Sequence, residues 1–362
     1  METCKAAVFV GAGKPLAMQE FPVPPLEPGA VLIKSLVAAV CATDVHAFHN
    51  PRAPHPVIWG HENVGAIARL GKGVTTDAYE QALKEGDRVI YYPATCGRCF
   101  NCLAGGLPCE VRRNYGLRPF TTPPHITGGF GQYVYVEPNA LLLRIPDDMS
   151  TERALFAVIG NHTVMNGLEK LGGISVSDAV VVQGSGPVGM GALTQAKLAG
   201  ARRVIVVGAP AGRLQMAREM GADETVSIEE YREPEARAQR VRELTDGRGA
   251  DMVIECSGAD TAFQEGLEMV RAGGKYLNLG QLTDYGPMPV NPSLITRKSI
   301  LISGVLGPTF KHVTRALHAL HARVKYPVEK LITHEFPLQR VNEAFRVHET
   351  LEAMVAVVRP NG

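Results

Sequence analysis

A glycine-rich turn near the middle of the chain places the strongest constraint on its fold. Residues 180–183, Val-Val-Val-Gln, form a run typical of a buried strand, and a helix is predicted over 190–199. Between them lies Gly-Ser-Gly-Pro-Val-Gly, in which successive glycines permit a tight turn, close approach of a pyrophosphate and close helix packing. The helix N-terminus then offers N–H groups to the anion. We therefore predict a dinucleotide-binding turn made of Gly184, Gly186, Pro187, Val188 and Gly189.

The segments after this turn alternate between strand and helix signals. Short apolar runs recur at 203–207, 251–255, 275–279 and 299–303, with helical stretches between them. Such alternation is typical of a parallel sheet with helices on both faces. We therefore expect an α/β fold, with a doubly wound Rossmann domain over residues 155–304.

The N-terminal part of the chain has a different pattern. Its short β-branched or aromatic runs, separated by Gly and Pro, lie at 6–10, 31–39, 64–69, 88–92 and 132–136. A chain of 362 residues is more than twice the common domain size of about 150, so two domains are expected. We predict a β-rich domain over 1–154 that the C-terminal residues 305–362 rejoin.

The charge balance excludes several classes of partner. Lys and Arg number 37 against 36 Asp and Glu, which gives a net charge of +1 and no basic patch for nucleic acid or an anionic membrane. No apolar run approaches the roughly 18 residues of a membrane span, and the first residues make a poor signal peptide. The sequence thus predicts a cytoplasmic protein with a small-molecule ligand. Its seven cysteines, an odd number, favour metal binding or catalysis over a disulfide framework.

The strand after the glycine-rich turn bears on the choice of coenzyme. In NAD-binding domains this strand ends in an acid that binds the adenosine ribose, but here it ends in Gly208. No carboxylate repels a 2′-phosphate, and Arg213 is a candidate partner for one, although it is equally explained as a surface arginine of the first helical turn. The prediction is NAD(P), with a preference for NADP.

Four cysteines lie within 14 residues, in the order Cys96-Gly-Arg-Cys99-Phe-Asn-Cys102-(six residues)-Cys109. Thiolates at this spacing wrap tetrahedral zinc, and four protein ligands leave no open position, so the predicted site is structural. A disulfide pair and an iron–sulfur cluster are the alternatives. The predicted lobe covers about residues 93–113.

A second set of candidate ligands lies upstream. Cys41, His61 and Glu62 offer a thiolate, an imidazole and a carboxylate, which together hold a zinc ion with a position open to a substrate oxygen. Thr43 is placed to contact that oxygen, and His46 to carry its proton to solvent. Taken singly, Cys41 also fits a buried apolar position, and His61 a hydrogen-bonded turn residue.

Together these motifs resemble the zinc-dependent medium-chain dehydrogenases, the alcohol and polyol dehydrogenases. The resemblance covers essentially the whole chain. It rests on Cys41-x-Thr-Asp-x-His, Gly60-His-Glu, the cysteine lobe, the glycine-rich turn, the segment 249–258 and the closing segment from Val341-Asn-Glu-Ala-Phe to Pro360. It implies a GroES-like β-rich catalytic domain around a central Rossmann domain, a cleft between them, one catalytic and one structural zinc per chain, and dimers or tetramers. Residue by residue, it makes Cys41, His61 and Glu62 catalytic zinc ligands and makes Thr43 and His46 the proton relay.

The chain departs from the family pattern at three points. The usual third zinc ligand falls on Ile159, which cannot bind metal, so that Glu62 with water, or Asn161 or His162, must complete the site. The gap from Cys102 to Cys109 is one residue shorter than usual, and Gly208 replaces the usual acid.

The sequence thus predicts NAD(P)-dependent oxidation of a secondary or polyhydroxylated alcohol, or the reverse reduction of its carbonyl. One alternative is a zinc-free quinone or enoyl reductase on the same scaffold, which Ile159 keeps open. Another is a non-catalytic dinucleotide-binding protein with structural zinc only. Phe48, Trp59 and Tyr92 are candidates for lining the substrate pocket, and each equally fits a core position.

Overall fold

The chain forms two compact units in the computed structural model, which describes residues 2–105, 109–111, 113–121, 123–281, 286–322 and 325–362. One unit comprises residues 1–158 and Ile332–Gly362, and the other comprises Ile159–Leu331. The predicted domain limits of 154 and 305 therefore differ from those observed, by a few residues at the first and by a whole helix at the second. Residues 106–108 and 112 of the predicted cysteine lobe lie outside the described residues.

The helix that changes unit is α10 (Phe310–Ala322), which packs on α4 (His162–Lys170). It buries Val313, Leu317 and Leu320, and both Lys311 and Arg315 pair with Glu169 of α4. The apolar face and these ion pairs hold residues 305–331 in the second unit, so the chain returns to the first unit only at Ile332.

The first unit is built on two sheets. The larger has the order β15-β16-β3-β5-β6-β8, with β7 also paired to β3, and the smaller has the order β2-β1-β4. The bounds are β1 (Thr3–Phe9), β2 (Ala17–Pro22), β3 (Val31–Ala39), β4 (Val57–Ile58), β5 (Glu62–Leu70), β6 (Arg88–Tyr92), β7 (Tyr133–Val136), β8 (Leu141–Arg144), β15 (Ile332–Pro337) and β16 (Val355–Arg359). The helices of this unit are α1 (Ala42–His49), α2 (Phe100–Ala104), α3 (Thr151–Phe156) and α11 (Val341–Glu349). The expected N-terminal strand segments all fall on observed strands.

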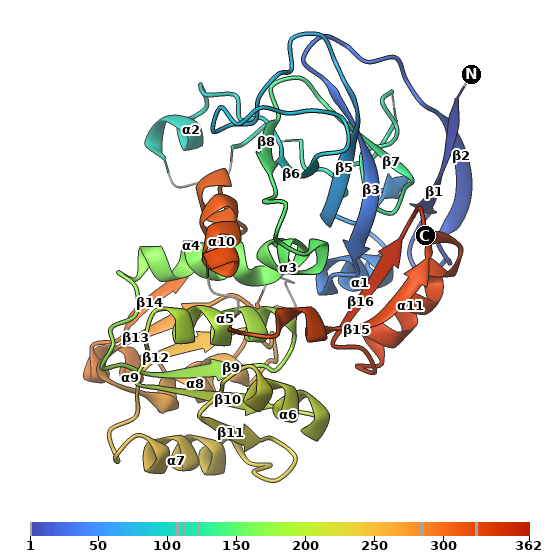
Figure 1. The fold of residues 1–362 in the computed structure, drawn as a ribbon. Helices are drawn as coiled ribbons and strands as arrows, with labels where there is room; N and C mark the ends of the chain where they lie inside the picture. Colours follow the sequence, from blue (N-terminus) through green and yellow to red (C-terminus); the bar gives the residue numbers. More distant parts are fainter. Residues whose placement is uncertain (1, 106–108, 112, 122, 282–285, 323–324) are drawn as a thin grey trace. The chain divides into compact units, whose positions relative to one another are not determined.

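The C-terminal segment completes the larger sheet. Strand β16 pairs antiparallel with β3, with Val357 opposite Ala39, and β15 runs parallel to β16. Figure 1 shows these two strands, drawn in red, beside the blue β3, with α11 next to them. The end of the chain thus lies against the strand that leads to Cys41.

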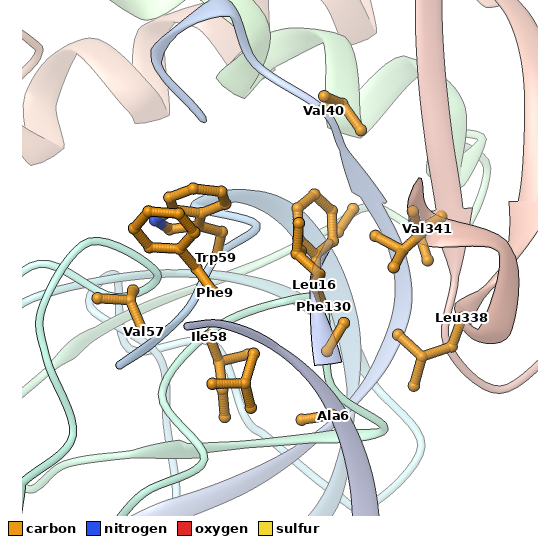
Figure 2. Close-up of a cluster of buried hydrophobic side chains, with 14 of the residues drawn as sticks. Ala6, Phe9, Leu16, Val40, Val57, Ile58, Trp59, Phe130, Leu338 and Val341 are labelled. Carbon is orange, nitrogen blue, oxygen red and sulfur yellow. The ribbon is translucent and has the colours of Figure 1, made fainter. Parts of the chain in front are cut away.

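An aromatic stack forms part of the core of this unit. The indole of Trp59 lies between the rings of Phe9, at a centroid distance of 4.1 Å, and Phe345, at 5.7 Å, and both pairs are nearly parallel. Figure 2 shows Phe9 against Trp59 within the cluster. Trp59 therefore belongs to the core, and the stack anchors the segment before His61 to β1 and to α11.

The second unit is a parallel sheet with the order β11-β10-β9-β12-β13-β14. Its strands are β9 (Ala179–Gln183), β10 (Arg203–Gly208), β11 (Glu224–Ser227), β12 (Ala250–Glu255), β13 (Val270–Asn278) and β14 (Leu301–Gly304). Besides α4 and α10, its helices are α5 (Pro187–Leu198), α6 (Ala211–Glu219), α7 (Pro234–Leu244), α8 (Ala262–Met269) and α9 (Pro292–Lys298). In Figure 1, α4 and α5 lie on one side of the sheet and α7 to α9 on the other.

This arrangement confirms the predicted doubly wound fold. The chain runs outward from β9 through β10 and β11, then crosses back to β12 and runs the other way. In such sheets a dinucleotide binds outside the carboxyl ends of the strands where the order reverses, here between β9 and β12. Within the described part of the chain, no helix is both long and apolar enough to cross a membrane.

Candidate active site

Strand register brings the upstream ligand candidates together. Strands β3 and β5 are antiparallel with Ala39 opposite Glu62, so Cys41, two residues beyond Ala39, comes next to His61. A ligand atom from each of Cys41, His61 and Glu62 lies within 4.8 Å of the other two. The structure thus brings Cys41 together with His61 and Glu62, which follow it by about 20 positions in the sequence.

Close backbone packing fixes the turn that carries His61. Gly60 has a φ of +91°, and a Cβ on it would lie 2.7 Å from the backbone nitrogen of Phe130. A Cβ on Gly116 would lie 2.7 Å from the backbone nitrogen of His61. A Cβ on Gly128 would overlap the backbone oxygen of Ile58, the last residue of β4. Because only glycine permits these approaches, the segments around 116 and 128–130 clamp the turn. Hydrogen bonds from the backbone N–H of Gly129 to Gly60 and of Phe130 to Trp59 complete it.

Asp44 joins the two halves of this cluster. It is fully buried, and its Oδ2 accepts a hydrogen bond of 3.1 Å from the backbone N–H of Cys41. Its Oδ1 lies 3.3 Å from Nδ1 of His61. A carboxylate in this position favours the imidazole tautomer with hydrogen on Nδ1, which leaves the Nε2 lone pair for a metal. Asp44 belongs to the motif around Cys41, but the sequence alone assigns it no role. Its position three residues after Cys41, in the first turn of α1, is the feature from which the hydrogen bond to the backbone of Cys41 could have been predicted.

The electrostatics of the cluster fit a divalent cation. Burial, and then the charge of Glu62, raise the pKa of the Cys41 thiol, and burial raises the pKa of Glu62 to about 7. Burial opposes protonation of His61, but Asp44 and Cys41 outweigh it and hold the pKa well above its usual value. The three donors thus lie close together, with Glu62 buried and Cys41 and His61 half-buried. Zinc binds this combination of thiolate, imidazole and carboxylate, and its charge would favour the two anionic forms.

The two relay candidates lie on α1. The Oγ1 of Thr43 is 3.6 Å from Sγ of Cys41, so its hydroxyl lies at the ligand cluster. His46 follows one turn later and is exposed. Burial of part of its ring lowers the pKa of His46, and the nearby His49 lowers it further.

The cysteine lobe has the spacing of a zinc site. Sγ of Cys96 lies 3.9 Å from that of Cys102, and Sγ of Cys99 lies 4.0 Å from that of Cys109. Zinc–sulfur bonds of about 2.3 Å in a tetrahedron place the sulfurs about 3.8 Å apart. Hydrogen bonds from backbone N–H groups lower the pKa values of Cys96, Cys99 and Cys109, which favours the thiolate form that zinc binds. All four cysteines are free thiols in the structure, which does not contain the alternative disulfide pair.

The glycine-rich turn has the geometry of a phosphate site. Gly184 has a φ of +106°, and a Cβ on Gly189 would overlap its carbonyl oxygen. Gly186 is the N-cap of α5, and a Cβ there would meet nothing closer than Arg213, at 3.9 Å. Pro187 opens the helix, where its missing N–H costs nothing, and Val188 packs on Gly160. The turn thus leaves space beside Gly186, at the N-terminus of α5.

The end of β10 is shaped by a neighbouring serine. Ser185 donates a hydrogen bond of 2.8 Å to the carbonyl oxygen of Ala209, and its Oγ would lie 2.5 Å from a Cβ on Gly208. An acidic side chain at 208 therefore does not fit while Ser185 keeps this position. The guanidinium of Arg213 lies near Gly186, and burial lowers its pKa.

Ile159 and the two candidate replacements for the third ligand, Asn161 and His162, belong to the second unit. Ile159 and Gly160 depart from helical geometry within a π-helical turn, Ala157–Asn161. The Oδ1 of Asn161 accepts a hydrogen bond of 3.0 Å from Gln195, and Nδ1 of His162 accepts one of 2.9 Å from the backbone of Thr163. Both side chains thus use an acceptor atom within their own unit.

Known proteins share this organisation over the full length of the chain. Residues 27–147 match the alcohol dehydrogenase GroES-like domain, and residues 187–322 match the zinc-binding dehydrogenase domain. The 5-exo-hydroxycamphor dehydrogenase of Pseudomonas putida is 33% identical over 351 residues, which cover 96% of each chain. Sorbitol dehydrogenase of Bacillus subtilis is 30% identical, and the match covers 99% of this chain and 98% of that protein. The alcohol dehydrogenase structure from Thermotoga maritima superimposes with a TM-score of 0.92 at 29% identity, over 100% of both chains.

Two domain matches and near-complete coverage of relatives that are at least 30% identical establish the family. The chain belongs to the zinc-dependent medium-chain dehydrogenase family and is an oxidoreductase that acts on CH–OH groups.

Proposed function

We propose that this oxidoreductase transfers a hydride between NAD(P) and a secondary alcohol or polyol, in either direction, at the cluster of Cys41, His61 and Glu62. The observation that carries the proposal is the convergence of these three donors, with Asp44 orienting the imidazole. The relatives named for hydroxycamphor and sorbitol support a hydroxylated carbon as the reacting group.

The chain's own residues supply positioning and proton transfer. A zinc ion, when bound, supplies Lewis acidity toward the substrate oxygen, and the nicotinamide ring exchanges the hydride. Thr43 lies beside Cys41 and is placed to hydrogen-bond the reacting hydroxyl. His46, exposed on the same helix, takes the proton that leaves on alcohol oxidation and passes it to solvent.

We further propose two zinc ions per chain, one at Cys41, His61 and Glu62 and one at the four cysteines of the lobe. Elemental analysis of protein purified without added zinc is expected to give two zinc ions per chain. Cys41→Ser is expected to leave one zinc and to abolish alcohol oxidation, because one ligand of the open site is gone. Cys99→Ser is expected to remove the other zinc and to lower stability.

Cys4→Ser is the matched control, because Cys4 is a buried thiol on β1 outside both clusters. It should leave the zinc content unchanged. One zinc per chain that survives Cys41→Ser and disappears in Cys99→Ser would contradict the catalytic site.

The relay makes the reaction pH-dependent through His46. Only the neutral imidazole accepts a proton, so kcat/KM for alcohol oxidation is expected to rise as pH passes upward through its pKa. Burial and His49 place that pKa below the usual value for histidine. His46→Gln is expected to lose this limb of the pH profile and to lower kcat/KM about 100-fold.

His49→Gln is the control on the same helix. It should keep the limb and shift it to higher pH, because the charge that lowers the pKa of His46 is removed. A profile that is the same in the wild type and in His46→Gln would rule out the relay.

We propose a preference for NADP, with Arg213 as the partner of the 2′-phosphate. Support comes from Gly208, where Ser185 excludes an acidic side chain, and from the guanidinium next to Gly186. Arg213→Leu is expected to raise KM for NADP at least about tenfold and to change KM for NAD little, because a charged hydrogen bond to phosphate is lost. Arg218→Leu, an exposed arginine later in α6, should change neither. Equal losses with both coenzymes would exclude recognition of the 2′-phosphate.

We propose a homodimer, alone or as half of a tetramer, that pairs at β14. This strand ends the sheet of the second unit, and Leu301 and Leu306 on and beside it are 54% and 64% exposed. An exposed apolar edge strand is a ready template for a second copy. Leu301→Lys is expected to halve the molecular mass measured by light scattering. Val176 lies in a loop and is 74% exposed, so Val176→Lys is the control and should leave the mass unchanged. A mass that Leu301→Lys does not change would exclude this interface.

We also propose a location in the cytoplasm, which the seven free cysteines support.

A further inference from the structure

A buried acid lies behind the coenzyme edge of the second unit. Glu255 is the last residue of β12 and is completely buried. Its Oε1 accepts hydrogen bonds from the backbone N–H of Ser257 at 2.6 Å, the hydroxyl of Ser257 at 2.7 Å and the backbone N–H of Gly258 at 2.8 Å. Its Oε2 accepts one of 3.1 Å from the backbone N–H of Gly280. All of these donors are neutral, so the side chain serves as a multiple acceptor and not as half of an ion pair.

The donors belong to two loops at the carboxyl edge of the sheet. Residues 256–258 follow β12, and residues 279–280 follow β13. The backbone carbonyl oxygen of Glu255 also accepts hydrogen bonds from Leu279 and Gly280. Glu255 therefore fixes the distance between the two loops through both its side chain and its main chain.

The same loops are in backbone contact with each other and with the phosphate turn. A Cβ on Gly184 would lie 2.9 Å from the backbone nitrogen of Ser257, and one on Gly258 would lie 2.7 Å from the carbonyl oxygen of Gly280. A Cβ on Gly280 would lie 2.6 Å from Oε2 of Glu255. Because nothing separates the loops, a change in the acceptor pattern of Glu255 must move one of them.

The position of these loops determines which part of the coenzyme they serve. In a doubly wound fold the half that follows the phosphate turn, here β9 to β11, binds the adenosine end of the dinucleotide. The loops tied to Glu255 follow β12 and β13, in the other half, across the switch point. They therefore face the nicotinamide end.

We propose that Glu255 is a positioning residue that holds the loops 256–258 and 279–280 in place for the nicotinamide half of the coenzyme, an inference that rests on the proposed use of NAD(P). A carboxylate accepts hydrogen bonds on both oxygens, whereas a carboxamide of the same shape turns an N–H group toward one set of donors. Glu255→Gln thus inverts one hydrogen bond without changing side-chain volume.

The test compares whole coenzyme with its adenosine half. Binding of NADPH and NADH is measured by fluorescence titration, and binding of adenosine 2′,5′-bisphosphate and ADP by calorimetry. Glu255→Gln is expected to weaken the preferred dinucleotide about tenfold, the size of one lost buried hydrogen bond, and to change the adenosine fragments less than about twofold. A uniform structural defect would weaken both alike, and that result would overturn the proposal, as would unchanged binding of the dinucleotide.

Two further variants keep the result interpretable. Glu265→Gln removes an acceptor from another buried acid of the same unit, which accepts from Nε and Nη2 of Arg237 at 2.8 Å. It should lower the midpoint of thermal unfolding and leave both kinds of nucleotide binding unchanged. Ser257→Ala removes the hydroxyl bond to Glu255, together with the bond of 3.2 Å that this hydroxyl accepts from the backbone N–H of Ala259, so it is expected to fold and to weaken the dinucleotide about threefold.

The inference and the proposed function fail in different ways. Wild-type protein that binds neither dinucleotide would contradict the proposed function, and the proposal for Glu255 with it. Wild-type binding that Glu255→Gln and Ser257→Ala leave intact would overturn only the role of Glu255.

Discussion

The first unit depends on a contact between backbones. The turn at Gly60 and His61 is enclosed by segments around Gly116 and Gly128 at distances that leave no room for a Cβ. Such contact restrains the turn mainly through backbone atoms, which have no rotamers to change. Phe9 and Phe345 both stack on Trp59 in the same segment, so that residues near both ends of the chain pack against the residues before His61. This explains why residues 332–362 belong to the first unit: their helix supplies one ring of the stack, and their strand pairs with β3.

The second unit follows the same rule at its carboxyl edge. Gly184 packs on the backbone of Ser257 and Gly258 on that of Gly280, whereas Gly208 packs on the side chain of Ser185. Glycine at these positions leaves the backbone open to close approach by a ligand. Such a surface suits a coenzyme whose phosphates and sugars are recognised by N–H groups and close approach.

The sequence was sufficient where spacing along the chain encodes geometry. The glycine-rich turn and the four cysteines are local, since each places its functional atoms within one turn or loop: the turn leads into α5, and the four sulfurs lie within 4.8 Å of one another. The cluster of Cys41, His61 and Glu62 is not local. Each member lies at or next to the end of a strand, and the antiparallel pairing of β3 with β5 brings those two ends together. The return of the chain at Ile332 instead of 305 was not predictable in this way, because the sequence of an apolar helix face does not identify the element it packs on, which for α10 is α4. The roles of Asp44 and Glu255 were equally hidden, since a buried acid is recognised by the donors that fold around it.

Those two acids have a common logic. Asp44 accepts from the backbone of Cys41 on one oxygen and faces His61 with the other, and Glu255 joins two loops in the same manner. Burying a carboxylate costs free energy, which hydrogen bonds to neutral groups offset only in part. A neutral amide would cost less to bury, but it has one oxygen and would present a donor where both segments need an acceptor. A buried carboxylate is therefore used where hydrogen-bond acceptors are needed in two directions. That requirement arises where two segments distant in sequence must be held at one distance, as a metal cluster and a coenzyme edge both demand.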